Sequence, residues 1–337
     1  MARYYLERTL QALVTVYAVV TLTFVMIRYL PGGPMDFLMS QLIQRARGGG
    51  GSTIDMEAIR HRVEVYTNVQ PDQPMWVQYV DYLNSLAHLD LGRSIWYDAP
   101  VSSILAGAIP WTVFVLSIAL AINFTLGIGL GALMAYFEGG TFDSGGTLFA
   151  ILSTSVPYYI VAILMVYFLG YQWELFPTGG RMPSDATVGF NVEFVVGIFY
   201  HAALPVISLV TGFAGLALSM RANSISVLGE DYIRVARLRG ISSRRIAFRH
   251  VIRNAILPIW TQLLISIGFL FGGSVILEQI FKYHGVGYYM FKAIQSRDYP
   301  LMMGGFLVIT IAVVISVYVA DLSYGKIDPR VTTGGEE

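Results

Sequence analysis

The sequence predicts an all-α polytopic membrane protein with six transmembrane helices and an external segment of about 80 residues after the first helix. Charged side chains make up 13% of the 337 residues, against roughly 25% in soluble domains. Apolar runs of roughly 20 residues, enough for a helix to cross about 30 Å of hydrocarbon, recur along the chain. We predict the spans at Leu10–Leu30, Trp111–Tyr136, Leu148–Tyr171, Phe199–Met220, Ile256–Leu277 and Leu301–Leu322.

The first predicted span follows Arg3 and Arg8, so a cleaved signal peptide is the alternative to a transmembrane helix. The apolar run is longer than that of a signal peptide, and no small-residue cleavage site precedes Pro31. We therefore predict an uncleaved helix, with residues 1–30 forming the N-terminus and the first span.

Residues 31–110 form the predicted external segment. It contains the glycine run Gly48–Gly51 and two helix-like stretches, Asp55–Tyr66 and Gln73–Leu86. Large apolar side chains share one face of the second stretch at helical spacing: Trp76, Tyr79, Tyr82 and Leu83. This face could contact an external partner, but we favour packing on the membrane domain.

The other five spans form a predicted transmembrane core over residues 111–322. Pro157 and Pro205 are expected to bend the third and fourth spans, because proline cannot donate the helical hydrogen bond. Three glycines in the second span are expected to let a neighbouring helix approach closely: Gly127, Gly129 and Gly131.

Arginine placement predicts the orientation of the chain, because short loops rich in Lys and Arg stay in the cytoplasm. The loop at residues 221–255 carries eight arginines: Arg221, Arg234, Arg237, Arg239, Arg244, Arg245, Arg249 and Arg253. We predict that this loop, both termini and the tail at residues 323–337 are cytoplasmic. The loop at residues 137–147 gives no support, since it holds Glu138 and Asp143 and no basic residue.

The predicted spans contain almost no ionisable side chains, which argues against a proton-coupled transporter or pump. No lysine stands in a phosphate-binding loop, the chain has no cysteine, and no serine clearly pairs with a histidine at membrane depth. We expect no catalytic residue, no cofactor-binding residue and no metal site. The formal net charge of zero gives no indication of nucleic-acid binding. The sequence assigns no residue to a substrate path.

Residues 231–258 place seven arginines between two apolar runs, in a pattern typical of a helix–turn–helix. The short helix Tyr232–Arg239 is expected to end at Gly240, which can adopt the left-handed conformation. Ser242 or Ser243 can cap the following helix, and Pro258 marks the start of the fifth span.

Two functions remain open for this segment from its residues alone. Its arginines could hold a cytoplasmic loop against anionic lipid and fix the topology. Alternatively, Tyr232–Gly240 could dock on a soluble protein. A sharp glycine stop is not needed for lipid contact, and the small side chain of Ala236 would permit tight seating in a partner's groove.

The stretch "YIRVARLRG", followed by "RHVIRNAILP", resembles the cytoplasmic loop of ABC-transporter permeases of the dipeptide/oligopeptide/nickel branch. Further fragments resemble this branch in the same order along nearly the whole chain: "LPGGP" at 30–34, "QPDQPMWVQYVDYL" at 70–83, "DLGRS" at 90–94, "SVPYYIVAILMVYF" at 155–168, "ALPVISL" at 203–209, "GGSVILEQIF" at 272–281, "GVGYYMFKAIQSRDYP" at 285–300 and "DLSYGKIDPR" at 321–330. The chain is most similar to the first of the two permease subunits in such systems.

The resemblance implies a type I ABC importer permease fold and a set of partners. These are a second homologous permease subunit in a heterodimer, two cytoplasmic ATPases that bind ATP and Mg, an external substrate-binding protein, and the lipid of a prokaryotic inner or plasma membrane. No cofactor is expected in this chain. The resemblance also implies that one short segment couples the permease to the ATPase: Tyr232, Arg234, Ala236, Arg237, Arg239 and Gly240.

The chain departs from the family at three places. Arg234, Val235 and Ala236 occupy the positions of the general Glu-Ala-Ala pattern, and His284 stands where proline is usual. The loop at residues 137–147 lacks the basic residues usual in the family. Di- or oligopeptide is the substrate class we expect, with oligosaccharide or a nickel complex as the alternative. A channel or exporter, an integral-membrane enzyme and a receptor that transports nothing are more distant alternatives.

Overall fold

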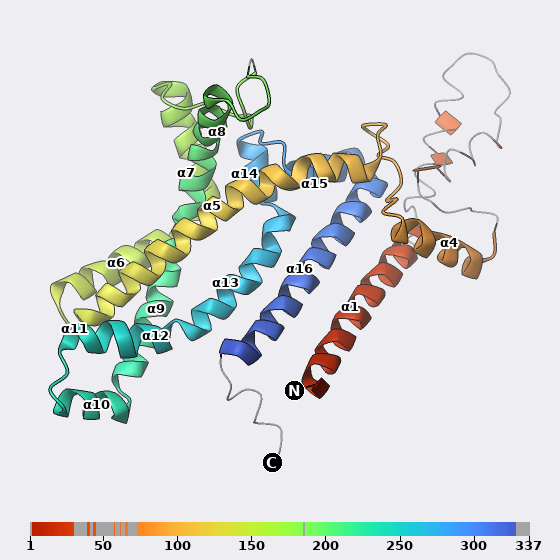
Figure 1. Cartoon of the computed structure of the whole chain (residues 1–337). Helices are drawn as coiled ribbons and strands as arrows, with labels where there is room; N and C mark the ends of the chain where they lie inside the picture. Colours follow the sequence, from red (N-terminus) through yellow and green to blue (C-terminus); the bar gives the residue numbers. More distant parts are fainter. Residues whose placement is uncertain are drawn as a thin grey trace. The chain divides into compact units, whose positions relative to one another are not determined.

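The computed structural model describes residues 2–29, 39–40, 43–44, 57, 61, 65–66, 73–184 and 186–327. Over these residues the fold consists of helices and their connections, with one isolated β-bridge between Arg93 and Pro100 (Figure 1). The predicted Gly48–Gly51 run, most of the Asp55–Tyr66 stretch and the tail beyond residue 327 lie outside the described residues.

Five helical segments in the described part of the chain are long and apolar enough to cross a membrane. They are Leu6–Met26, Val101–Tyr136, Val192–Val210, Leu257–Ile280 and Tyr299–Val319. A sixth span is present if the helix pair Thr141–Ser155 and Tyr158–Gln172, bent by 80°, counts as one. The prediction of six spans therefore holds when this bent pair is counted.

The chain divides into two compact units, of which the first comprises Met1–Thr112, Phe271–Val275 and Gly285–Glu337. In this unit α1 (Ala2–Tyr29) packs along α16 (Tyr299–Ile327), and α15 (Val286–Ser296) packs on α16 as well.

The helix predicted at Gln73–Leu86 is present as α4 (Met75–Ala87) and packs within the first unit. Tyr82 is buried with Phe24 of α1 and Met303 and Leu307 of α16, and Tyr79 and Leu83 pack around that cluster. The predicted packing of this face is confirmed for these three α4 side chains. Trp76 is the exception, because 72% of it remains exposed.

The second predicted span is present as α5 (Val101–Tyr136), which begins before the expected Trp111. The added turns are amphipathic, since Val101, Leu105 and Ala108 recur at helical spacing and are buried against α15 and the start of α16. Pro110 lies inside α5 and does not end the helix.

The second unit comprises Val113–Leu270 and Ile276–His284. The first of its spans to be interrupted is the predicted third span, which breaks at Pro157. There the chain bends by 80° between α6 (Thr141–Ser155) and α7 (Tyr158–Met165), which continues into the π-helix η1 (Val166–Gln172). The prediction of a bend at Pro157 is confirmed.

The predicted fourth span, Phe199–Met220, is divided into α8 (Val192–Val210) and α9 (Phe213–Leu228). The interruption falls at Thr211–Gly212, whereas Pro205 lies inside α8. Polar side chains bond the backbone at the break, which lowers the cost of an interrupted helix in lipid. The Asn123 amide donates to the Leu209 carbonyl at 3.2 Å, and the Ser153 hydroxyl donates to the Thr211 carbonyl at 3.2 Å.

Close approach between α5 and α9 depends on two of the three glycines predicted to permit it. A Cβ atom on Gly131 would lie 2.3 Å from the Ala217 carbonyl oxygen, and one on Gly127 would lie 2.8 Å from Leu216 Cβ. A Cβ atom on Gly129 would meet nothing within 4 Å. The prediction is therefore confirmed at Gly127 and Gly131 and is wrong at Gly129.

The basic segment begins after α9 with α10 (Asp231–Leu238). It continues through α11 (Ser243–Ile246), the π-helix η2 (Ala247–Val251) and α12 (Ile252–Ala255). α13 (Leu257–Phe269) follows with Pro258 in its first turn, as predicted. A 3-10 turn, η3 (Leu270–Gly272), and α14 (Val275–Ile280) complete the fifth span.

Candidate functional site

The predicted turn after α10 is a complete Schellman motif. Gly240 has a φ of +74°, its N–H donates to the Arg237 carbonyl at 3.0 Å, and the Ile241 N–H donates to the Ala236 carbonyl at 3.2 Å. The prediction that a left-handed Gly240 ends the helix is confirmed. Ser242 lies at the N-cap of α11, but its side chain makes no capping hydrogen bond.

The inner face of α10 is held against the rest of its own unit. Ile233 and Ala236 are buried in one cluster with Ile246 of α11 and Val251 of η2. Ala236 is only 6% exposed and faces the helices of its own chain. The expectation that it seats α10 in a partner's groove is therefore wrong. Its small side chain instead lets α10 lie close to the following helices.

The outer face of α10 is apolar along its centre and is exposed among the residues that the structure describes. Tyr232, Val235 and Leu238 recur every third residue and are 43%, 52% and 81% exposed. Arg234, Arg237 and Arg239 are also exposed. We call these six side chains the α10 surface. Val235 and Leu238 were not among the predicted coupling residues, although their three-residue spacing from Tyr232 is visible in the sequence.

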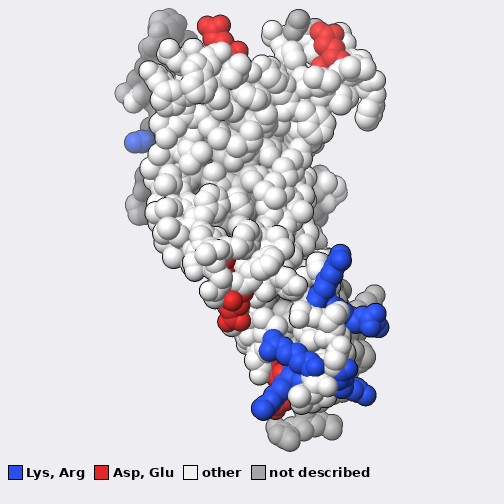
Figure 2. Space-filling model, turned by 90° about the vertical axis from the view of Figure 1, so that its left-hand side faces the viewer, with Lys and Arg blue, Asp and Glu red and all other residues white. Residues whose placement is uncertain are grey.

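The α10 surface belongs to a larger basic patch. Lys and Arg side chains gather at one end of the face shown in Figure 2, over the segment from α10 to α12. All seven arginines between residues 231 and 255 are exposed. Because a patch that combines exposed apolar and basic side chains is unusual on an uncovered protein surface, it indicates an interaction site.

Side-chain amides connect α10 and α9 to α12. The Asn254 amide donates to the Tyr232 hydroxyl at 3.0 Å, and the Asn223 amide donates to the Ala255 carbonyl at 3.3 Å. Together with the buried cluster under α10, these bonds join α9, α10 and α12, although the tight turn at Gly240 separates α10 from α12 in sequence. A force applied to the α10 surface would therefore act on α9 and α12 together.

An ion pair between a half-buried arginine and a buried carboxylate joins α9 to the first turn of α6. The Asp143 carboxylate, 3% exposed, accepts from Arg221 Nε and, at 2.8 Å, from Arg221 Nη2. It also accepts the Gly139 N–H at 3.0 Å. The hydrogen bonds to Asp143, together with the attraction of Glu138, raise the pKa of the Arg221 guanidinium. The acidic loop that does not fit the orientation rule thus has a structural role.

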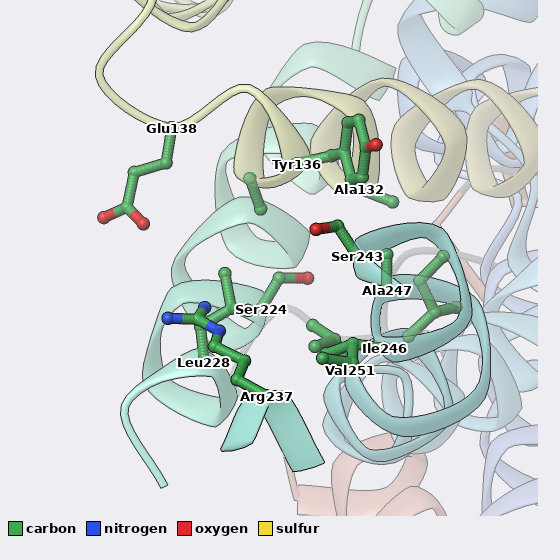
Figure 3. Close-up of a pocket in the computed structure, with 12 residues that line it drawn as sticks. Ala132, Tyr136, Glu138, Ser224, Leu228, Arg237, Ser243, Ile246, Ala247 and Val251 are labelled. Carbon is green, nitrogen blue, oxygen red and sulfur yellow. The ribbon is translucent and has the colours of Figure 1, made fainter. Parts of the chain in front are cut away.

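A cavity of about 350 Å³ lies at the base of α10 (Figure 3). Arg237 and Glu138 lie toward the same side of it, and the hydroxyls of Ser224 and Ser243 point into it. Its wall comes from the end of α5, from α9 and from α11 and η2. Among the described residues, no three His, Asp or Glu side chains lie together as they would in a metal site.

Residues 127–333 match the family described as binding-protein-dependent transport system inner membrane component. The oligopeptide transport system permease protein AppB of Bacillus subtilis is 31% identical over 334 residues, which cover 98% of this chain and 99% of AppB. The dipeptide transport system permease protein DppB of the same organism is 31% identical over 333 residues, 98% of each chain. The similarity thus extends well beyond the basic segment.

Proposed function

The chain belongs to the binding-protein-dependent transport system inner membrane components, the permease subunits of ABC importers, and we propose that its own system imports di- or oligopeptides. The family resemblance predicted from the ordered motifs is confirmed, and the chain is a multi-pass membrane protein. Support for a peptide substrate comes from AppB and DppB, which are named for oligopeptide and dipeptide transport and align over almost their full lengths.

Members of this family work with ATPase and binding-protein partners. For this chain the proposed set is two cytoplasmic ATPases that bind ATP and Mg, an external binding protein and a second homologous permease subunit in a heterodimer. The proposed location is a prokaryotic inner or plasma membrane, with both termini and the loop at residues 221–255 in the cytoplasm. The clustered arginines of that loop support this orientation.

The observation that carries the coupling proposal is the uncovered α10 surface, which is apolar at its centre and bordered by arginines. An amphipathic helix of this kind suits a groove on a soluble partner. In the proposed complex, Tyr232, Val235 and Leu238 contact the ATPase, while Arg234, Arg237 and Arg239 make the polar contacts at the edge.

Coupling follows from what α10 is attached to. When ATP draws the two ATPases together, the groove that holds α10 moves. Because α10 is packed on η2 and bonded to α12, the motion reaches α9 and α13, and the Arg221–Asp143 pair extends it to the turn between α5 and α6. The proposed result is a change in the opening of the path through the membrane.

Replacing Gly240 with valine is expected to reduce peptide uptake and peptide-stimulated ATP hydrolysis severalfold while the protein still inserts. A β-branched residue at a left-handed position costs about 1–2 kcal/mol, which would displace the turn that fixes the angle of α10. The effect comes from backbone strain, since a Cβ atom at Gly240 meets nothing within 4 Å. The measurement is uptake of labelled peptide by proteoliposomes that contain the assembled transporter, with its binding protein and ATP.

Two controls separate strain from size. Gly240→Asn should keep most of the uptake, because asparagine tolerates the left-handed conformation. Gly107→Val, in α5, adds the same side chain at a helical glycine that also has open space, and should be silent. Full uptake by Gly240→Val would count against the coupling role of this turn. Failure of the wild-type transporter to take up any peptide would reject the substrate class instead.

A further inference from the structure

A second cavity adjoins the one at the base of α10. It is a groove of about 710 Å³ on the same unit, and Ala132, Tyr136, Ala247 and Ile252 line both spaces. The remaining wall of the groove is largely apolar, with Thr125 and Arg244 as its polar members and Phe124, Ile128, Gly129, Leu133, Phe137 and Phe248 as the rest. The two cavities together therefore present a long apolar surface joined to a polar compartment.

The groove follows one face of α5 over about three turns. From Phe124 to Tyr136 the helix rises roughly 18 Å at 1.5 Å per residue, compared with about 15 Å for one leaflet of the hydrocarbon core. Tyr136 ends the second span, where amphipathic rings favour the headgroup zone. The polar compartment accordingly lies at headgroup depth, and the apolar groove lies at the depth of an acyl chain.

The polar compartment carries balanced charge and an unsatisfied hydroxyl. Arg237 and Glu138 border it on the same side (Figure 3). Ser224 is fully buried, lines the compartment, and its Oγ has no hydrogen-bond partner among the described residues. Since a buried polar atom normally finds a partner, a ligand that offers a hydrogen-bonding group is expected here.

We propose that these two cavities bind one phospholipid with a zwitterionic headgroup that carries a primary ammonium. One acyl chain lies along α5 in the groove. The phosphate accepts hydrogen bonds from the Arg237 guanidinium and the Ser224 hydroxyl, and the ammonium donates to the Glu138 carboxylate. Glu138 selects this headgroup, because Arg237 and Arg244 can pair with the phosphate of any phospholipid, whereas only an ammonium headgroup also donates to the Glu138 carboxylate.

The bound lipid would occupy the joint between the second span and the coupling segment. Its headgroup contacts the turn after α5 through Glu138, α9 through Ser224 and α10 through Arg237, the elements that the coupling motion has to rearrange. The proposal does not depend on which solute the transporter carries, so it can fail or succeed separately from the peptide assignment.

The test uses the full chain in nanodiscs of phosphatidylethanolamine, phosphatidylcholine and phosphatidylglycerol, with a trace of phosphatidylethanolamine that has a photoreactive acyl chain. After irradiation, crosslinked peptides are mapped by mass spectrometry. Adducts are expected within residues 124–137 and 244–252. Excess unlabelled phosphatidylethanolamine should displace the probe, and phosphatidylcholine, which has no N–H to donate to Glu138, should do so less well.

Gly129→Phe provides the blocking variant, because a side chain there points into the groove and a Cβ atom meets nothing within 4 Å. Labelling should fall at least about tenfold, because losing about two buried methylene contacts already lowers the affinity for the acyl chain by about that factor. Gly107→Phe, at another open glycine of α5, should label like wild type. Glu138→Gln should leave the groove labelled but remove the preference over phosphatidylcholine.

Several results would overturn the proposal. Undiminished labelling of Gly129→Phe would place the lipid elsewhere, and equal displacement by all three unlabelled lipids in wild type would remove the headgroup site. Stronger displacement by phosphatidylglycerol would contradict the zwitterion. Labelling that disappears when the chain is assembled with its partner subunits would make the groove a protein interface.

Ser224→Ala, which removes only the hydroxyl, should reduce labelling even if the larger variant misfolds.

Discussion

Replacing Arg221 with methionine is expected to destabilise the protein by about 3–5 kcal/mol, the usual cost of leaving one member of a buried ion pair alone. Asp143 would keep its charge at 3% exposure, with the hydrogen bond from the Gly139 N–H still in place. The turn between α5 and α6 would then lose its attachment to α9. The measurement is the midpoint of thermal unfolding of the purified protein in detergent, together with peptide uptake, and both should fall.

A double-mutant cycle identifies the cause. Asp143→Leu combined with Arg221→Met removes both charges and should recover much of the stability lost by Arg221→Met alone, because no uncompensated charge stays buried. Arg249→Met, at an exposed arginine of the basic segment, is the matched control and should unfold like wild type. Equal melting of the Arg221 and Arg249 variants would show that the pair adds no stability.

Replacing Leu238 with aspartate is expected to abolish retention of the ATPase. Leu238 is 81% exposed at the centre of the α10 surface, so the change should not disturb folding. A charge in the desolvated centre of an interface costs about 2 kcal/mol or more, equivalent to about a thirtyfold loss of affinity. Copurification of the ATPase with the tagged permease, and ATP hydrolysis by the complex, should both fall.

Leu89→Asp is the matched control, because Leu89 is another exposed leucine, at 77%, and lies just after α4 in the predicted external segment. It should leave ATPase retention unchanged. If both variants retain the ATPase, the α10 surface is not its contact, and the lipid-anchoring function of the arginines would be favoured. If both lose it, the effect would be general destabilisation of the complex.

Much of the fold could be predicted because its signals are local. The bend at Pro157 was predicted from the missing backbone donor of proline, although Pro110 and Pro205 lie inside helices, and Gly240 provides a stop that few other residues can. The α4 face is similarly readable, since Tyr79, Tyr82 and Leu83 follow one helical stripe. The apolar runs mark the spans by length alone, as the membrane requires.

The features that sequence analysis missed depend on contacts distant in the chain. The break at Thr211 and Gly212 is stabilised by Asn123 and Ser153, and neither lies near it in sequence. The early start of α5 depends on packing against α15 and α16. Asp143 and Arg221, 78 residues apart, form a pair that no local pattern indicates.

The candidate site was predicted in position but not in orientation. Five of the six expected coupling residues are exposed, while Ala236 faces inward. Small size favours both tight docking and tight internal packing, so composition alone could not separate these two roles. Helical spacing could have identified Val235 and Leu238, because they share a stripe with Tyr232.

The most direct test of the central claim, that a separate ATPase acts on this permease through α10, uses a single cysteine at Leu238 in a chain that has no other. In the assembled transporter, a short thiol-to-amine crosslinker is expected to join Cys-substituted position 238 to the ATPase, with a yield that changes when ATP is added. Labelling of this position by a membrane-impermeant thiol reagent applied outside intact cells, or absence of any crosslink to a nucleotide-hydrolysing subunit, would contradict the claim.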